Sequence, residues 1–115
     1  MRTLTFDQFE FDPPDSEETL HLWIASKSDF PFPDVRSFAA AAVSVEAAPA
    51  LCQPVPFSDS FGYGIVRGYL PRFAGVTVPP SCTWPTYLLL DDVQEWDGVF
   101  EADGLFIRYH WWSTA

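Results

Sequence analysis

The chain has 115 residues, which suffices for one compact domain and leaves no room for a second. Hydrophobic residues make up 48% of it and aromatic residues 17%, so the composition predicts a packed core and excludes a disordered protein. Sixteen acidic against six basic residues give a net charge of −10, which argues against binding nucleic acid or an anionic membrane through phosphates. We therefore expect a single acidic globular domain over residues 1–115.

The N-terminal residues lack the apolar run of a signal peptide, and no stretch approaches the ~20 apolar residues of a membrane span. We therefore expect a cytoplasmic protein. There is no Asn, and one Lys stands against five Arg, a bias typical of GC-rich genomes. A bacterium, or a phage infecting one, is the expected source. Without an export signal, Cys52 and Cys82 are expected to be free thiols.

Clusters of proline divide the chain into five stretches, because proline fixes φ and removes a backbone donor. Proline clusters predict four loops, at residues 13–14, 31–33, 49–56 and 79–85. The stretch 4–11 predicts a strand with a possible bulge near Gln8, because its apolar residues change parity there. The stretch 15–27 begins as a helix would, with Asp15 as N-cap and Glu18 three residues later. Its apolar residues also alternate, so a strand is an open alternative.

Two further elements are predicted in the middle of the chain. Residues 34–48 predict a helix, because apolar residues recur on one helical face and the alanine run has high helix propensity. Residues 63–70 alternate between two faces and predict a strand, whose glycines indicate close backbone packing or a bulge.

The C-terminal third has the most strand-like pattern. Strands are predicted at 86–90 and at 105–112, with odd-numbered and even-numbered side chains of the last strand on opposite faces. Between them, two Asp-Gly pairs favour tight turns, although a short helix over 91–100 is an alternative. The pattern predicts an α+β domain with a mainly antiparallel sheet and one or two short helices, with an all-β sandwich or barrel as the alternative.

No motif for catalysis stands out. Nucleophilic catalysis needs Ser or Cys beside a base. The residues of these types considered for such a site are Cys52, Cys82, Ser81, His21 and His110. None of them stands in a recognisable nucleophile motif, and no metal-ligand spacing or phosphate-binding loop is matched. We therefore expect no catalytic residues, no metal site and no cofactor.

The acidic residues gather in two groups. The N-terminal acidic group comprises Asp7, Glu10, Asp12, Asp15, Glu17 and Glu18, and the C-terminal acidic group comprises Asp91, Asp92, Glu95, Asp97, Glu101 and Asp103. If the first and last strands are neighbours in the sheet, both groups would form one negative face. Such a face would fit a channel lined by Arg and Lys, where carboxylates take the places of phosphates. A merely solubilising surface is the alternative.

Aromatic residues lie close to the C-terminal acidic group. Trp96 and Trp112 are expected to be exposed anchors there, because Trp buries a large area at a low entropic cost. The expected partner-binding residues are Asp12, Asp15, Glu17, Glu18, Asp91, Asp92, Glu95, Trp96, Asp97, Glu101, Asp103 and Trp112.

These features favour a macromolecular binding protein over an enzyme. The leading hypothesis is an inhibitor that blocks a basic, nucleic-acid-handling partner with an acidic, aromatic-rimmed surface, acting as a nucleic-acid mimic. A phage anti-defence protein of the anti-CRISPR or anti-restriction type would be an example. The alternatives are an immunity protein for a basic toxin, a small enzyme or small-molecule carrier, and a structural component of a phage or other assembly. No direct contact with nucleic acid or membrane is expected.

Overall fold

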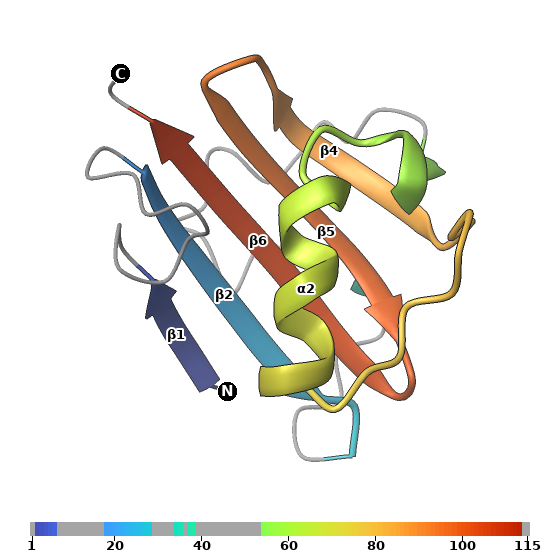
Figure 1. The fold of residues 1–115 in the computed structure, drawn as a ribbon. Coiled ribbons are helices and arrows are strands. Elements are labelled where there is room, and N and C mark those ends of the chain that lie inside the picture. Colours follow the sequence, from blue (N-terminus) through green and yellow to red (C-terminus); the bar gives the residue numbers. More distant parts are fainter. Residues whose placement is uncertain (1, 7–17, 29–33, 36, 39–53, 114–115) are drawn as a thin grey trace.

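A computed structural model describes residues 2–6, 18–28, 34–35, 37–38 and 54–113, and within them six strands form one open antiparallel sheet (Figure 1). The strands are β1 (Arg2–Phe6), β2 (Glu18–Ser26), β3 (Val55–Pro56), β4 (Pro85–Asp91), β5 (Glu95–Ala102) and β6 (Leu105–Ser113). The 3-10 helix η3 (Phe57–Asp59) and the α-helix α2 (Tyr63–Phe73) lie between β3 and β4 in the chain. The strand order is β1-β2-β6-β5-β4-β3. This arrangement agrees with the predicted antiparallel α+β class.

Helix α2 covers one face of the sheet, called the helix face below (Figure 1). In β6, Ile107, Tyr109 and Trp111 lie on this face and are buried in the main hydrophobic core. Trp96 and Phe100 of β5 pair with this strand and belong to the same core. The alternation predicted for the last strand is therefore confirmed, and the even-numbered side chains of β6 occupy the opposite face.

The two predicted Asp-Gly turns have different outcomes. Asp103 and Gly104 join β5 to β6 with φ angles of 51° and 76°, as a tight hairpin turn requires, so this turn is confirmed. Asp97 and Gly98 instead lie within β5, so both the turn and the alternative helix over 91–100 are wrong there. Gly98 serves packing, because it lies against the phenol ring of Tyr109.

Helix α2 occupies the stretch 63–70 for which alternation predicted a strand, and that prediction is wrong. Val66 and Leu70 are buried at helical spacing against the sheet. A Cβ added at Gly64 or at Gly68 would meet nothing within 4 Å, so these glycines lie on the open side of the helix and not in close packing. The apolar residues of this stretch fit both the period of a strand and that of a helix. The helix forms because it buries one apolar face against the sheet.

Of the two alternatives for the stretch after Asp15, the strand is confirmed as β2. Leu20, Leu22 and Ile24 are buried on the helix face and pair with odd-numbered residues of β6. Residues 4–6 of the strand predicted at 4–11 belong to β1, which begins at Arg2, and the rest of the predicted strand, with the bulge near Gln8, lies outside the described residues.

The predicted helix at 34–48 is described only at its start. The backbone N–H of Ser37 donates to the Oδ1 atom of Asp34 over 2.8 Å, which is the geometry of an N-cap. Phe38 is buried on the opposite face of the sheet, where its ring stacks on Phe106 at 5.6 Å. Residues 39–48 lie outside the described residues. Within the described part of the chain, no helix has the length and hydrophobicity needed to cross a membrane.

Candidate functional site

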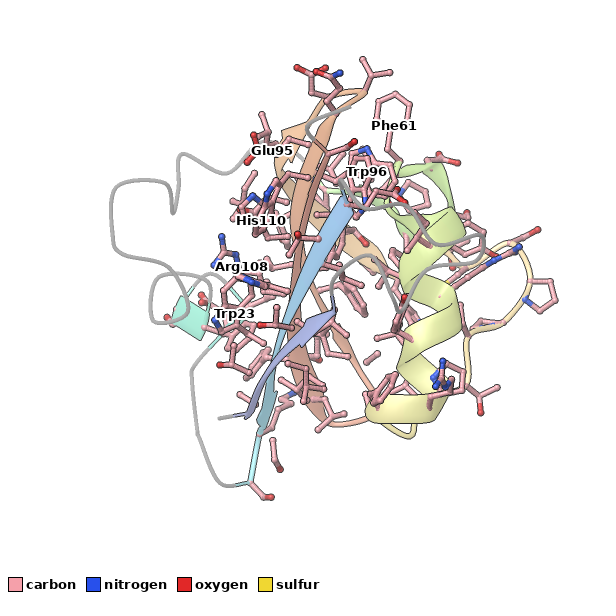
Figure 2. All side chains as sticks on the ribbon, turned by 60° about the vertical axis from the view of Figure 1, so that its left-hand side comes forward. Trp23, Phe61, Glu95, Trp96, Arg108 and His110 are labelled. Atoms are coloured by element: carbon pink, nitrogen blue, oxygen red, sulfur yellow. The ribbon has the colours of Figure 1, made fainter. Side chains whose placement is uncertain are left out.

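The face of the sheet opposite α2 bears a band of polar and aromatic side chains from β2, β5 and β6 (Figure 2). Strand pairing sets their order, because His21 lies across from His110, and Trp23 lies across from Arg108. The band starts at a small apolar cluster around Phe106 and ends at the C-terminal end of β6. Alternation along paired strands therefore gathers ionisable groups that are far apart in sequence.

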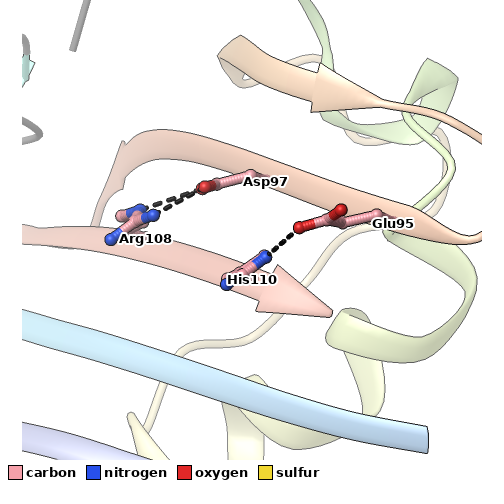
Figure 3. Close-up of polar contacts among 4 residues, drawn as sticks. All are labelled: Glu95, Asp97, Arg108 and His110. Carbon is pink, nitrogen blue, oxygen red and sulfur yellow. Dashed lines mark hydrogen bonds and ion pairs between the residues drawn. The ribbon is translucent and has the colours of Figure 1, made fainter. Parts of the chain in front are cut away.

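The middle of the band is a buried ion pair between β5 and β6 (Figure 3). The Nε atom of Arg108 donates to Oδ1 of Asp97 over 2.9 Å, and Nη2 donates to Oδ2 over 2.6 Å. The side chains of Arg108 and Asp97 are 5% and 11% exposed. The guanidinium also lies 4.2 Å from the centre of the Trp23 ring. This bidentate pair joins β5 to β6 and fixes the orientation of both side chains in the middle of the band.

The outer end of the band is a cluster of two histidines, one carboxylate and one indole. The Nε2 atom of His110 and the Oε2 atom of Glu95 are 2.6 Å apart, and the Glu95 side chain is 44% exposed (Figure 3). The ring of Trp112 lies 4.7 Å from that of His110 and 5.0 Å from that of His21. Trp112 therefore forms a wall beside an accessible carboxylate.

This cluster borders a pocket of about 400 Å³. Its lining comes from two segments, the β4–β5 turn with the first residue of β5 and the end of β6, and comprises Asp92, Gln94, Glu95, His110, Trp112 and Ser113. The backbone holds these two segments together, because the N–H of Ser113 donates to the carbonyl of Gln94 over 2.9 Å. Two carboxylates beside an aromatic ring suit a cationic group, which gains both charge-assisted hydrogen bonds and a cation–π contact.

Comparisons with protein-family models, with curated proteins and with solved structures give no match. The function is therefore inferred from the chemistry of the pocket and its surroundings.

The structure brings together part of the predicted partner-binding set. Asp92, Glu95 and Trp112 line the pocket, and Glu18 lies at the same end of the sheet, across from Ser113. Asp91 ends β4 beside the β4–β5 turn. Asp12, Asp15 and Glu17 lie outside the described residues.

Other members of the predicted set are placed elsewhere. Glu101 pairs with Lys27 at 3.1 Å near the far end of β5, and Asp103 lies in the β5–β6 turn there. Asp97 is occupied by Arg108. The C-terminal acidic group is thus divided between the two ends of β5. The supposition that the first and last strands are neighbours is also wrong, because β2 separates β1 from β6.

Trp96 is not the exposed anchor that was predicted. It is buried on the helix face, where its ring stacks on that of Trp111 at 3.8 Å. The reason is strand parity, because Trp96 directly opposes Trp111 across β5 and β6. Trp112, one position further along β6, points to the opposite face and is half-buried.

Several residues of the band and of the pocket lining were not in the predicted site, namely Trp23 and Arg108 of the band and Gln94 and Ser113 of the pocket. His21 and His110 were considered only as residues of an enzyme or small-molecule site, and not as part of the partner-binding surface. The polar even-numbered residues of the last strand were a usable signal, since a polar row opposite a buried row indicates a face available for function. Their partners on β2 had no such signal, because the β2–β6 pairing joins distant parts of the chain.

The surroundings of His21 lower its pKa and so favour the neutral imidazole. Burial lowers its pKa most, and the electrostatic effects of the neighbouring His110 and Arg108 lower it further, from the ordinary value of 6.5. A neutral imidazole at this position avoids repulsion with the guanidinium that lies on the neighbouring strand.

Acidification is expected to destabilise the protein through His21. The unfolded chain binds a proton there near pH 6.5 and the folded chain only at lower pH, so stability falls as the pH drops through and below 6.5. Urea unfolding between about pH 7.5 and about pH 5 should show a smaller loss of stability in His21→Gln than in the natural protein. Equal losses in both proteins would show that His21 does not contribute to this pH dependence.

Proposed function

We propose that this protein is a binding protein that inhibits a basic macromolecule, and that the pocket at the end of β6 is the centre of its contact surface. The observation that supports this proposal is the meeting of the Asp92 and Glu95 carboxylates with the ring of Trp112 in one pocket of about 400 Å³. An Arg or Lys side chain of the partner would pair with the carboxylates and stack against the indole.

The charge of the whole chain favours a large basic partner. A net charge of −10 would steer a basic protein toward this surface and repel nucleic acid. The partner class that fits is a nucleic-acid-handling enzyme or complex, whose cationic channel normally receives phosphates. Inhibition would follow from blocking that channel. The phage anti-defence role and the neutralisation of a basic toxin both rest on this chemistry, and the identity of the captured protein distinguishes them.

The ion pairs within the protein narrow the contact set. Asp97 and Glu101 already neutralise Arg108 and Lys27, so their carboxylates contribute less to a partner. Glu95 is bonded to a histidine but remains 44% exposed. We therefore assign the main contact to Asp92, Glu95 and Trp112.

The proposal is tested by capturing partners from a bacterial lysate at low salt, eluting them at high salt, and identifying them by mass spectrometry. The natural protein is expected to retain a basic nucleic-acid enzyme or toxin that elutes with salt. Glu95→Lys is expected to bind it about 30-fold or more weakly, because it reverses a charge at the centre of the contact. Trp112→Ala should lose about 2 kcal/mol of binding free energy, as an anchor residue does.

The matched control is Asp59→Lys, which makes the same change of charge at an exposed residue of η3 outside the pocket. It is expected to weaken binding only slightly, through the change in net charge. Equal weakening by the Glu95 and Asp59 variants would show that overall charge, and not this pocket, determines binding. Recovery of no basic protein would contradict the proposed function.

The contact between Glu95 and His110 favours a small enzyme as the second candidate. A carboxylate bonded to an imidazole orients the ring, as in general-base catalysis. Cys82, however, lies in the helix-face core, where burial raises the pKa of its thiol and makes it a poor nucleophile. Among the described residues, no group of three or more His, Cys, Asp or Glu side chains is arranged to hold a metal ion. Hydrolysis of activated esters that is lost in His110→Ala would favour the enzyme.

A further inference from the structure

A second concave surface lies on the other side of the sheet, between α2 and the segment 77–81 that follows it. This groove has a volume of about 620 Å³, within the range of small-molecule sites. Apolar groups of Tyr63, Pro71 and Val78 contribute to its lining. It shares no lining residue with the acidic pocket.

The absence of a side chain at Gly68 keeps the groove open. Gly68 belongs to the lining, and a Cβ added there would meet nothing within 4 Å. Glycine in the interior of a helix is unfavourable compared with almost any other residue, so its presence is not explained by helix stability. Gly64, one turn earlier, is equally open but lies outside the groove lining.

The groove contains a cation in a strongly acidic protein. The guanidinium of Arg67 lies 5.1 Å from the centre of the Tyr63 ring, at the groove. Within the part of the chain that the structure describes, the ion pairs involve Lys27, Arg108 and His110, and none of them includes Arg67. A planar guanidinium supported by a ring, with free donors, matches the geometry of a carboxylate.

The edge of the groove holds an unusual backbone conformation. Ser81 has a φ of 52°, in the left-handed region that non-glycine residues rarely adopt. Ser81 belongs to the groove lining together with Thr77, so two hydroxyl-bearing residues border the groove that contains Arg67. Strained residues of this kind are concentrated at ligand sites.

We propose that this groove is a binding site for a small amphipathic carboxylate. The apolar body of the ligand lies against Tyr63, Pro71 and Val78, and its carboxylate pairs with the guanidinium of Arg67. Apolar walls with one cation select a molecule that has both an apolar part and one anionic group. The site is independent of the proposed function, because the groove and the acidic pocket lie on opposite sides of the sheet.

Binding of 2-naphthoate to the full chain, followed by isothermal titration calorimetry, tests this site. The natural protein is expected to bind it at one saturable site. Arg67→Gln should weaken binding about tenfold or more, because it removes a charged hydrogen-bond donor. Arg72→Gln is the matched control, since Arg72 lies on the same helix, also faces a ring at 4.9 Å, and is outside the groove lining. It should change affinity less than about twofold.

A second pair of variants tests the shape of the site. Gly68→Leu is expected to fill the groove and to abolish binding, whereas Gly64→Leu should bind as the natural protein does. Both substitutions place a good helix former at an open position, so both variants are expected to fold. Neutral 2-naphthamide should bind about tenfold more weakly than 2-naphthoate.

Three results would overturn the proposal. The first is the absence of saturable binding of 2-naphthoate to the natural protein. The second is equal weakening by each variant and its control, which would place the bound molecule outside the groove. The third is equal affinity for 2-naphthamide, which would exclude the pairing of a carboxylate with Arg67.

Discussion

Asp97→Ala is expected to lower the free energy of unfolding by about 3–5 kcal/mol, because it leaves a buried guanidinium without its carboxylate. Arg108 is only 4% exposed, and both of its hydrogen bonds to Asp97 cross from β6 to β5 at the centre of the sheet. Urea unfolding followed by circular dichroism measures the loss directly.

The control for this prediction replaces both partners. Asp97→Leu combined with Arg108→Met removes the two charges together and keeps apolar volume, so it should be more stable than Asp97→Ala alone. A double variant as unstable as Asp97→Ala would show that the shape of this site matters more than the uncompensated charge. A loss below about 1 kcal/mol in Asp97→Ala would mean that the pair is no better than a surface ion pair.

Gly98→Ala is expected to destabilise the protein by about 3 kcal/mol, because the added methyl group has no space. Its Cβ would lie 2.6 Å from the Oη atom of Tyr109 and 2.7 Å from its Cζ atom. The ring cannot move away, since Tyr109 is fully buried and a Cβ at Gly62 would lie 2.6 Å from another of its ring atoms. Two glycines thus enclose one phenol ring.

Gly68→Ala is the matched control for this steric effect. It introduces the same methyl group at a helix position with nothing within 4 Å, and should stabilise the protein by about 1 kcal/mol through helix propensity. Thermal unfolding of both variants gives the comparison. If Gly98→Ala also stabilised the protein, the close approach of Tyr109 to Gly98 would be contradicted.

The first and last strands of the C-terminal meander were predictable because local signals agreed there, whereas β5 between them was expected to be a turn-rich segment or a short helix. Alternation in 105–112 and the Asp103-Gly104 turn point to the same hairpin, and the hairpin is present. The stretch 63–70 was not predictable in this way. Its glycines and its alternation favoured a strand, whereas the deciding factor was the apolar face of the sheet that a helix had to cover.

The candidate site was predictable only in its exposed part. Asp92 and Glu95 belong to the C-terminal acidic group, and Trp112 follows that group in the next strand, so the local sequence indicated an acidic, aromatic-edged surface. The burial of Trp96 and the pairing of Asp97 with Arg108 depend on strand register. Register is set by the packing of the whole sheet, which a local pattern does not contain.

The central position of β6 determines how this fold is assembled. Strands β4, β5 and β6 are joined by short turns, so they can associate quickly, whereas β2 must reach the other edge of β6 from a distant part of the chain. Until β2 arrives, β6 presents an unpaired edge along its length. The β2 strand of another copy can pair with this edge as well as the β2 strand of the same chain. At high concentration, refolding is therefore expected to give some strand-exchanged dimers.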